Sequence, residues 1–531
     1  MRQQSVKAGA FESGHFFRYT SGRWLVDEQA QLAKRYVTFN LQALKHGASC
    51  ALQSPCIQVA KLPEGLYNKV LSLRMENGKE VLAKIPNPNA GHPRSVVASE
   101  VATLDFLRNE LQIPVPRVIE WSLHNHDSTA NLVGAEFMLM EKVPGRQLSD
   151  VWPTMSEAER FGLVKSIVRI ENKLTDLKLS KYGSIYYRDN CPDGLTVEQV
   201  GLLDDRSSTS TSGFVIGPVA DRHFWPDEKE GLDIDRGPWD TSEAYFSAVA
   251  KCEIAKVRRN QHQNISLPLE SNAILIQLLE QFLQILPYIL PPGKDITRPV
   301  LLHGDLHSKN IFVDDTDPTQ VSGVIDWQGI WAAPLFTQAR VPSVFETDGP
   351  YTWGAVEPKL PDDYHSLSES DQQWASEKLS GDRLKKFYEL ASRKYNPLLT
   401  TALDAMRRED DPTTFLFHII QQAWLDGPVP LRQVLVQVYE KWDLITQRRG
   451  IQVPCPISFT EDQIREANEQ AEEWAVAFNE FDALRSQVVG KDGWVSHEEY
   501  AEAMAHFNAH KDELEELRKK LHRFGGAGLL C

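Results

Sequence analysis

The chain contains few cysteines, and no two of them form a closely spaced pair. Its 531 residues include six cysteines, at positions 50, 56, 191, 252, 455 and 531, and no Cys-x-x-Cys sequence. Small disulfide-stapled domains depend on densely spaced cysteines, so that class of protein is excluded. We therefore expect reduced thiols and an intracellular compartment.

Long apolar runs are also absent. No stretch of 18 consecutive apolar residues occurs, and the best candidate, residues 273–290, is interrupted by three glutamines and one glutamate. A membrane-spanning helix needs about 20 predominantly apolar residues, so this segment is expected to be a soluble helix. The sequence predicts no membrane span.

Basic residues are fewer than acidic residues in this chain. The chain has 57 Lys and Arg against 73 Asp and Glu, a formal net charge of −16. This balance argues against nucleic acid or an anionic membrane as a main partner and would suit a cationic small molecule. Residues 461–531 hold 8 basic and 16 acidic side chains, so solubility is the simpler interpretation. The length predicts two lobes with extensions.

One short motif carries most of the functional information. Residues 303–310 read His-Gly-Asp-Leu-His-Ser-Lys-Asn, and an Ile-Asp-Trp sequence centred on Asp326 follows. Asp305 and Asn310 have the spacing of the base and the metal-binding amide in a kinase catalytic loop. Two short apolar runs flank residues 314–318, which predicts a hairpin that returns Asp326 to Asn310. Two oxygen ligands near a carboxylate base suit magnesium-assisted phosphoryl transfer.

These motifs resemble the aminoglycoside phosphotransferase superfamily, which also includes choline kinase and other small-molecule kinases. The resemblance covers roughly residues 59–340. It implies an α+β, bilobal protein-kinase-like fold with a small β-rich N-lobe and a large helical C-lobe. It also implies transfer of a phosphoryl group from ATP, with Mg²⁺, to a hydroxyl of a small-molecule acceptor. Residues 19–24 and 235–239 are similar to a fungal branch, the altered inheritance of mitochondria phosphotransferases.

The resemblance divides the chain into four parts. We expect an N-terminal extension at residues 1–58, the N-lobe at 59–142, the C-lobe at 143–460 with an insert at 183–240, and a C-terminal helical hairpin at 461–531.

The insert at residues 183–240 is rich in aromatic and charged residues. Long irregular segments inside a compact domain are often functional. Two interpretations are open: a surface insert packed by its own aromatic residues, or a lid that borders the acceptor site. In the second, Asp221 or Asp235 would pair with a cationic group of the acceptor.

Three residues of the expected N-lobe are assigned to the nucleotide. Lys84 ends a strand and matches the position of the kinase lysine that contacts the phosphates. Residues 95–107 show the helical spacing of apolar residues, and the resemblance makes Glu100 on this helix the ion-pair partner of Lys84. Gly65 lies in a loop between two strands, which suits either a phosphate-covering loop or a plain turn.

The resemblance also assigns the remaining site residues. The strand at residues 137–141 is expected to lead into a hinge, where the backbone of Glu141 and Val143 would bind the adenine. Asp305 would accept the proton of the acceptor hydroxyl, and the metal ligands would be Asn310 and Asp326. His303 and His307 are expected to hold the loop by hydrogen bonds.

Two alternatives to a kinase remain open. The family often carries an acid in a Gly-Asp-Pro sequence that orders the catalytic loop, whereas residues 332–334 here are Ala-Ala-Pro. A nucleotide-binding scaffold (a pseudokinase) without turnover is therefore one alternative. The other takes His303, Asp305 and His307 as ligands of a metallohydrolase, but it leaves Lys84 without a role.

The C-terminal region combines a helical pattern with a loop similar to an EF-hand. Apolar residues recur at helical spacing over residues 461–484, and Gly493 falls where an EF-hand loop has its invariant glycine. Val488 and Gly490 would then fill positions that require oxygen ligands. We therefore expect a helical hairpin that caps the C-lobe and no calcium site.

The N-terminus bears on localisation. Its first 24 residues contain four basic residues and one acidic residue, without the Arg and Ser richness of a mitochondrial transit peptide. The residues alone favour an ordinary extension, whereas the fungal resemblance implies a mitochondrial protein, with a cytoplasmic one as the alternative.

Overall fold

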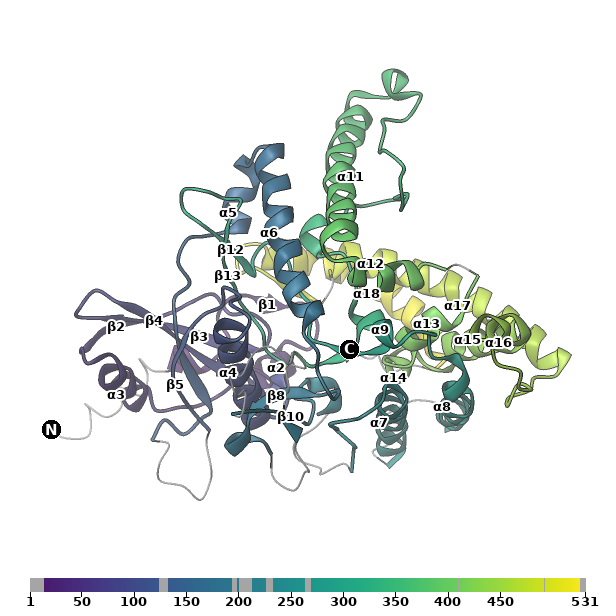
Figure 1. Cartoon of the computed structure of the whole chain (residues 1–531), viewed down its shortest axis with the longest axis horizontal. Helices are drawn as coiled ribbons and strands as arrows, with labels where there is room; N and C mark the ends of the chain where they lie inside the picture. Colours follow the sequence, from purple (N-terminus) through teal and green to yellow (C-terminus); the bar gives the residue numbers. More distant parts are fainter. Residues whose placement is uncertain are drawn as a thin grey trace.

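The chain folds into a β-sheet lobe and a larger helical lobe, which lie side by side in Figure 1. The computed structural model describes residues 14–123, 132–192, 198–199, 213–225, 233–262, 269–408, 410–490 and 492–525. The expected division into a small β-rich N-lobe and a large helical C-lobe is confirmed.

The N-lobe is built on a five-stranded antiparallel sheet. The strand order is β2 (Cys56–Lys61), β3 (Asn68–Met75), β4 (Glu80–Pro86), β6 (Phe137–Glu141) and β5 (Val118–Ser122). Val81, Ala83 and Ile85 of β4 are buried, as the two-residue period of a strand on a core requires. A hairpin at Asn77-Gly78 joins β3 to β4, and Gly78 has φ 81°, a conformation that favours glycine.

Two helices cover this sheet. α4 (Pro93–Asn109) contains the helix predicted at residues 95–107. α3 (Leu41–Leu52) packs against β5 and places Leu44 in the apolar core of the sheet lobe. Residues 14–58, which we expected to be an extension, therefore complete the core of the N-lobe.

The C-lobe is mainly helical. Its helices are α5 (Leu148–Val151), α6 (Glu157–Asp176), α7 (Ser242–His262), α8 (Leu269–Ile289), α9 (Lys294–Thr297), α10 (Leu335–Gln338), α11 (Glu369–Tyr395), α12 (Pro397–Ala405), α13 (Thr413–Ile419), α14 (Ala423–Asp426), α15 (Pro428–Glu440) and α16 (Trp442–Arg449). α6 begins at a capping box formed by Ser156 and Glu159. α11 packs against α6 and rises to the top of the view in Figure 1. Within the described ranges, no helix has the length and apolar character needed to cross a bilayer.

The segment that carries the Asp-x-x-x-x-Asn motif forms the predicted hairpin. Its sheet has the order β13 (Val321–Val324), β12 (Ile311–Val313) and β7 (Arg146–Gln147). After β13, the N–H of Ile325 donates to the carbonyl of Asn310 at 2.9 Å. This hydrogen bond places Asp326 beside Asn310, as the sequence pattern predicted.

The described part of the insert at residues 183–240 is buried between other elements. It contains a small sheet of β8 (Ser184–Tyr187), β10 (Phe214–Gly217) and β9 (Glu198–Gln199). β8 packs against α4 of the N-lobe, and Gly183 pairs with Ala332 of the C-lobe. These residues therefore connect the lobes and are not a surface appendage. Residues 193–197, 200–212 and 226–232 lie outside the described part of the chain.

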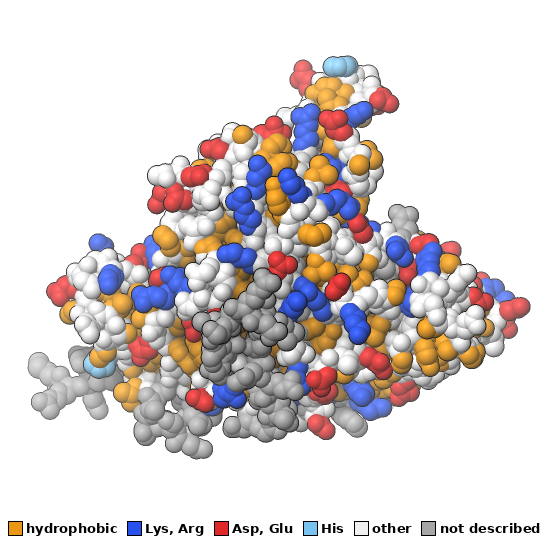
Figure 2. All heavy atoms as spheres, viewed as in Figure 1, with side chains coloured by type: hydrophobic (Ala, Val, Ile, Leu, Met, Phe, Trp, Pro, Cys, Tyr) orange, Lys and Arg blue, Asp and Glu red, His pale blue; other side chains and the backbone are white. Residues whose placement is uncertain are grey.

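The N-terminal and C-terminal regions of the described chain are in contact. The C-terminal region forms α17 (Glu461–Val488), β15 (Trp494–Val495) and α18 (Tyr500–His522), and the N-terminal region contains β1 (Arg23–Trp24) and α2 (Glu28–Ala33). α17 packs against α18 and α15, so the helical hairpin expected on the C-lobe is present. β1 pairs antiparallel with β15. On the face shown in Figure 2, acidic and basic side chains are interspersed.

Candidate active site

Lys84 is the centre of a charge cluster that joins the lobes. Lys84 lies on β4 and Glu100 on α4, and Lys84 Nζ is 2.7 Å from Glu100 Oε1. The same ammonium group is 3.0 Å from Oδ1 of Asp326 in the C-lobe. The ion pair that we expected between Lys84 and Glu100 is therefore present, and the Ile-Asp-Trp motif meets the sheet lobe at Lys84.

Burial and mutual attraction shift the pKa values of these three groups. Burial opposes the charge of Lys84, but attraction by Asp326 and Glu100 raises its pKa. Burial raises the pKa of Glu100 although Lys84 is beside it. The charge of Lys84 lowers the pKa of Asp326, whose side chain is 47% exposed. Lys84 thus has one buried partner and one that solvent reaches.

Asp326 has an uncommon backbone conformation. Its φ is 65°, in the left-handed region that few residues other than glycine adopt. Such positions persist where the surrounding structure determines them, and they cluster at functional sites. Here the Ile325–Asn310 hydrogen bond on one side and the Lys84 contact on the other fix the residue.

Asp305 and Asn310 are joined within the catalytic loop. Asn310 Nδ2 donates to the carbonyl oxygen of Asp305 at 3.0 Å, and Asn310 is buried. Because its amide nitrogen is used in this way, the amide oxygen of Asn310 is left as a ligand atom. This oxygen and the Asp326 carboxylate are donors of the kind that Mg²⁺ prefers, so the residues fit that ion. The Asp305 side chain is 72% exposed, which leaves its carboxylate accessible to a bound molecule.

The two histidines of the motif support the loop. His303 Nδ1 accepts the N–H of Asp305 at 3.2 Å, which leaves Nε2 to donate to the carbonyl of Ile325 at 2.9 Å. Burial lowers the pKa of His303 and keeps the ring neutral. His307 Nδ1 accepts the N–H of Lys309 at 3.1 Å. The structural role expected of both histidines is thereby supported, and the metallohydrolase alternative is disfavoured because both nitrogens of His303 are occupied.

Other side chains hold the loop where the family's Gly-Asp-Pro acid is missing. Gln338 Oε1 accepts the N–H of Leu302 at 3.0 Å, and Arg340 Nη1 donates to the carbonyl of Gly304 at 3.2 Å. The Ala-Ala-Pro segment itself forms β14 (Ala333–Pro334), which pairs with β11 (Pro299–Val300) just before the loop. Our sequence reasoning missed Gln338 and Arg340, because neither belongs to a motif or to a periodic pattern.

The residues expected near the adenine and the phosphates occupy the predicted elements. Glu141 ends β6, and its carboxylate accepts a hydrogen bond from Arg108 at 2.6 Å. Val143 is buried against Gly323, where an added Cβ would clash with it. Gly65 lies between β2 and β3, and a Cβ there would meet no described atom within 4 Å. Any contact of Glu141 or Val143 with adenine would therefore come from their backbone, as expected.

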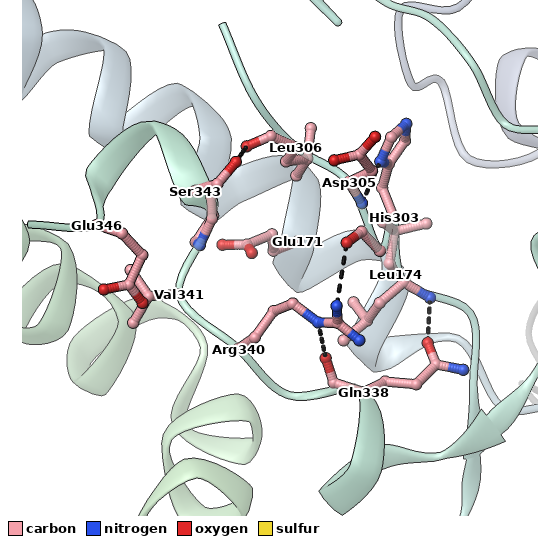
Figure 3. A pocket seen from close by; sticks show the side chains of 13 residues that line it. Glu171, Leu174, His303, Asp305, Leu306, Gln338, Arg340, Val341, Ser343 and Glu346 are labelled. Atoms are coloured by element: carbon pink, nitrogen blue, oxygen red, sulfur yellow. Dashed lines mark hydrogen bonds between the residues drawn. The ribbon is translucent and has the colours of Figure 1, made fainter. Parts of the chain in front are cut away.

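A cavity of about 150 Å³ lies beside the catalytic loop (Figure 3). Asp305, Arg340, Glu346 and Glu171 are the charged residues that line it. Glu171, on α6, is buried, and burial raises its pKa to about 8, although Tyr388 donates a hydrogen bond to it at 3.0 Å. The sequence contains no signal for Glu171, because it lies within an ordinary amphipathic helix.

We expect Glu171→Gln to stabilise the protein above about pH 5. The folded protein holds a proton on Glu171 between pH 4.5 and about 8 that the unfolded chain releases, so stability decreases as pH rises through this window. At neutral pH the variant should gain up to about 3 kcal/mol in free energy of unfolding. Denaturant unfolding at pH 5 and pH 7.5 measures this difference.

The control is Glu377→Gln, on the exposed face of α11, the helix that carries Tyr388. It should change stability by less than about 0.5 kcal/mol at both pH values. An equal effect of Glu171→Gln at the two pH values would contradict the burial of an uncharged carboxyl at this position.

A second cavity, of about 530 Å³, lies between the insert and the helices of the C-lobe. It is lined by Asp221, Arg222, His223, Phe224, Tyr245, Val249, Trp331, His418, Gln421, Gln422 and Leu425. Asp221 accepts the N–H of His223 at 2.8 Å, and burial raises the pKa of Asp221. Burial also lowers the pKa of His223 to about 3 and, beside Arg340, that of His418. Asp221 is therefore the acid of a cavity whose histidines are neutral.

Asp235, the other acid considered for the acceptor, is used within the insert. Its carboxylate accepts the indole N–H of Trp239 at 2.9 Å and the backbone N–H of Gly237 at 3.0 Å. The stretch around Asp235 therefore closes a local turn. Asp221, in contrast, lines the cavity of about 530 Å³.

In the described part of the chain, one cluster of at least three His, Cys, Asp or Glu side chains is compact enough to hold a metal ion, and it is formed by His223, Cys252 and Glu253. Lys256 Nζ lies 2.6 Å from Glu253 Oε1 and 3.4 Å from the ring of His223. The lysine ammonium thus already supplies the positive charge at this cluster. We assign it a structural role, in which Glu253 also accepts the N–H of Trp424 at 2.8 Å.

A sheet lobe, a helical lobe and an Asp-x-x-x-x-Asn loop that meets a strand lysine through Asp326 define a kinase-like phosphotransferase fold. The chain belongs to the phosphotransferase enzyme family (APH), whose model matches residues 58–334.

Relatives span most of the chain. A subtelomeric hrmA-associated cluster protein of Aspergillus fumigatus is 30% identical over 82% of this chain and 88% of its own length. The protein named altered inheritance of mitochondria protein 9, mitochondrial, of Yarrowia lipolytica is 22% identical over 90% of this chain and 84% of its own length. The similarity expected to this fungal branch is confirmed.

Solved structures give a weaker match. The gentamicin–APH(2″)-IIa complex is 12% identical and covers 82% of this chain and 97% of its own chain, with a TM-score of 0.36. A fructosamine-3-kinase described as putative, from Thermobifida fusca, is 13% identical, with coverage of 77% and 100% and a TM-score of 0.34.

Proposed function

We propose that this protein is an ATP- and magnesium-dependent phosphotransferase that acts on a hydroxyl group of a small metabolite. The observation that carries the proposal is the contact of Lys84 with both Glu100 and Asp326. Beside it, Asn310 is bonded to the backbone of Asp305. This set supplies a cation for phosphates, oxygen ligands for a metal and an accessible carboxylate for the acceptor.

In the proposed reaction, Asp305 accepts the proton of the acceptor hydroxyl while the hydroxyl oxygen bonds to the γ-phosphorus and the bond to ADP breaks. Lys84 neutralises charge on the phosphates, and Glu100 holds Lys84 in position. Asn310 and Asp326 would hold Mg²⁺, which when bound neutralises charge on phosphate oxygens. The protein thus acts mainly by positioning groups and by supplying charge.

The remaining nucleotide contacts are proposed on the same basis. The backbone at Glu141 and Val143 binds the adenine, and the loop that contains Gly65 covers the phosphates. Val143 follows β6, and the loop at Gly65 joins β2 to β3; these strands belong to the sheet that also carries Lys84, which supports the assignment.

We propose that the cavity at Asp221 receives the acceptor. Gln338, which lines the cavity beside Asp305, donates a hydrogen bond at 2.9 Å to the carbonyl of Trp331, which lines the larger cavity, so residues of the two cavities are in contact. Besides Arg222, the lining offers neutral histidines, two glutamines and one acid, which suit a polar, hydroxylated molecule whose cationic group pairs with Asp221. The charge balance of the chain is compatible with this choice.

Asp221→Asn should raise the acceptor KM about tenfold without a change in the ATP KM. A hydrogen bond to a charged group contributes about 1.5–3 kcal/mol, and 1.4 kcal/mol corresponds to a factor of ten. Steady-state kinetics with each substrate varied in turn provide the measurement. Asp235→Asn is the matched control, because it should lower the melting temperature and leave the acceptor KM of the folded protein unaltered.

The proposed function is tested by incubating the purified protein with Mg-ATP and a pool of hydroxylated and amino metabolites. We expect a phosphorylated product, identified by mass spectrometry, whose formation requires Mg²⁺. Binding of Mg-ATP without any product across the pool would instead support the scaffold alternative. Failure to bind Mg-ATP at all would refute both.

We propose a mitochondrial location, which is supported by the names of relatives such as the Yarrowia lipolytica protein. Imaging of the full chain with a C-terminal fluorescent tag, beside a mitochondrial marker, tests it. A diffuse cytoplasmic signal would favour the alternative.

A further inference from the structure

The loop between β2 and β3 is held by residues far from it in the sequence. The N–H of Glu64 donates to Ser21 Oγ at 2.5 Å, and the carbonyl of Glu64 accepts the hydroxyl of Tyr19 at 3.4 Å. The N–H of Thr20 donates to the Glu64 carboxylate at 2.7 Å. Three consecutive residues of the N-terminal segment therefore fix one residue of the loop.

The carboxylate of Glu64 is the centre of a buried ion-pair network. Its side chain is 0% exposed and lies 2.7 Å from Lys61 Nζ and 2.9 Å from Lys69 Nζ. Burial lowers the pKa of both lysines, and the carboxylate opposes this effect. A charge removed from water in this way is stable only while its partners stay in place. The loop cannot move away without separating these charges.

Arg35 adds a second attachment to the same loop. Its Nε donates to the carbonyl of Leu66 at 3.1 Å, and its own carbonyl accepts a hydrogen bond from Lys69 at 2.7 Å. The guanidinium group lies 4.3 Å from the ring centre of Trp24, which is 1% exposed. Trp24 belongs to β1, so the loop is connected through Arg35 to that strand.

β1 is in turn held by the C-terminal region. Trp24 pairs with Trp494 of β15, and the N–H of Leu25 donates to the carbonyl of Gly493 at 2.9 Å. His497 Nε2 is 3.0 Å from the carbonyl of Thr20. The guanidinium group of Arg23 also lies 3.5 Å from the ring centre of Tyr500.

The C-terminal hairpin is anchored on the C-lobe. Val429 of α15 forms a buried cluster with Ala477 of α17 and Leu521 of α18. Arg432 of α15 donates to Gln470 of α17 at 3.0 Å. The chain of contacts therefore runs from the C-lobe through α17, β15 and β1 to the loop at Glu64.

We propose that residues 19–35 and 493–500 form a terminal clamp that sets the position of the nucleotide loop, residues 62–67. The clamp is a further connection between the lobes, separate from the hinge at residues 142–145, from the Lys84–Asp326 contact and from the insert. A loop held in advance loses less conformational freedom when a nucleotide binds, which raises affinity. Glu64 and the β1–β15 pair are thus positioning elements for ATP. This inference rests on the proposed function.

Gly22→Ala tests the clamp without touching the loop or the site. A Cβ on Gly22 would meet the indole of Trp494 and would lie 2.5 Å from the carbonyl oxygen of Val495, so β1 and β15 must separate. We expect the Kd for Mg-ATP to rise about tenfold, while kcat at saturating ATP and the acceptor KM stay unchanged. Backbone amides of residues 62–70 should exchange with deuterium at least about tenfold faster.

His497→Ala is the milder second variant, because it removes only the contact with Thr20, and it should shift affinity and exchange in the same direction. Arg523→Ala is the control: Arg523 bonds to Glu473 at 3.0 Å on the exposed surface of the same hairpin, and the variant should behave like the parent. If Gly22→Ala fails to fold, the Mg-ATP affinity and the amide exchange of His497→Ala test the clamp.

The two hypotheses fail in different ways. A parent protein that does not bind Mg-ATP would refute the proposed function, whereas the exchange of residues 62–70 would still report on the clamp. Unchanged exchange and unchanged Mg-ATP affinity in folded clamp variants would overturn the clamp alone.

Discussion

Replacement of Asp305 by Asn is expected to lower kcat by about 100-fold or more, the range typical for loss of a general base. Affinity for Mg-ATP should change little. The side chain of Asp305 is exposed, whereas its backbone N–H and carbonyl hold the loop through His303 and Asn310. Asparagine keeps the size and those backbone contacts and removes the negative charge together with the ability to accept a proton. The variant therefore isolates the proposed chemistry from the structure of the loop.

The measurement is steady-state turnover with the acceptor identified from the metabolite pool. Nucleotide affinity is measured separately by calorimetry. Asp315→Asn, at an exposed acid in the turn of the adjacent hairpin, should leave turnover at the parental value. Turnover of the Asp305 variant within about threefold of the parent would show that another group takes the proton or that none is needed.

The parts of the site that depend on short local patterns were predictable from the sequence. Asp305 and Asn310 are five residues apart, which is the spacing in a kinase catalytic loop. The turn between the two apolar runs predicts a hairpin, and a hairpin returns Asp326 to Asn310. The strand that carries Lys84 and the helix that carries Glu100 follow from the two periodicities of strand and helix, whereas the pairing of these two residues was implied by the family resemblance. The structure brings these residues together within hydrogen-bonding distance.

Contacts between distant short segments were not predictable. β1 and β15 contain two residues each, too few for a periodic pattern. Their pairing joins positions separated by most of the chain. The loop around Gly493 was considered for calcium and instead carries the strand that meets β1. Leu44 could not be assigned to the core of the N-lobe, because an amphipathic helix does not specify which sheet it will cover.

Buried polar groups form the other unpredicted class. Glu171 and Gln338 stand in stretches whose residue types fit an ordinary solvated surface. Their roles depend on their partners in the fold: Tyr388 donates a hydrogen bond to Glu171, and the N–H of Leu302 donates one to Gln338. Such partners are determined by the tertiary structure, so local sequence patterns do not predict them.

Asp326→Ala is expected to weaken the binding of Mg-ATP by about 100-fold or more, with a far smaller effect on ATP without Mg²⁺. Loss of a side chain that merely supports a metal ligand lowers metal affinity about 10–100-fold, and loss of a direct ligand should do at least as much. Lys84 keeps its bond to Glu100 at 2.7 Å, so its contribution to phosphate binding should persist. The expected loss is therefore confined to the metal-dependent part of the affinity.

Calorimetry with and without Mg²⁺ separates the two parts. Asp326 has φ 65°, and alanine tolerates this conformation poorly, by about 1 kcal/mol, so Asp326→Asn is measured beside it. Asparagine tolerates the conformation and retains one oxygen ligand, and it should give an intermediate loss of Mg-ATP affinity. An alanine variant that binds ATP more weakly to the same extent with and without Mg²⁺ would place the metal elsewhere, and would leave Asp326 only its contact with Lys84.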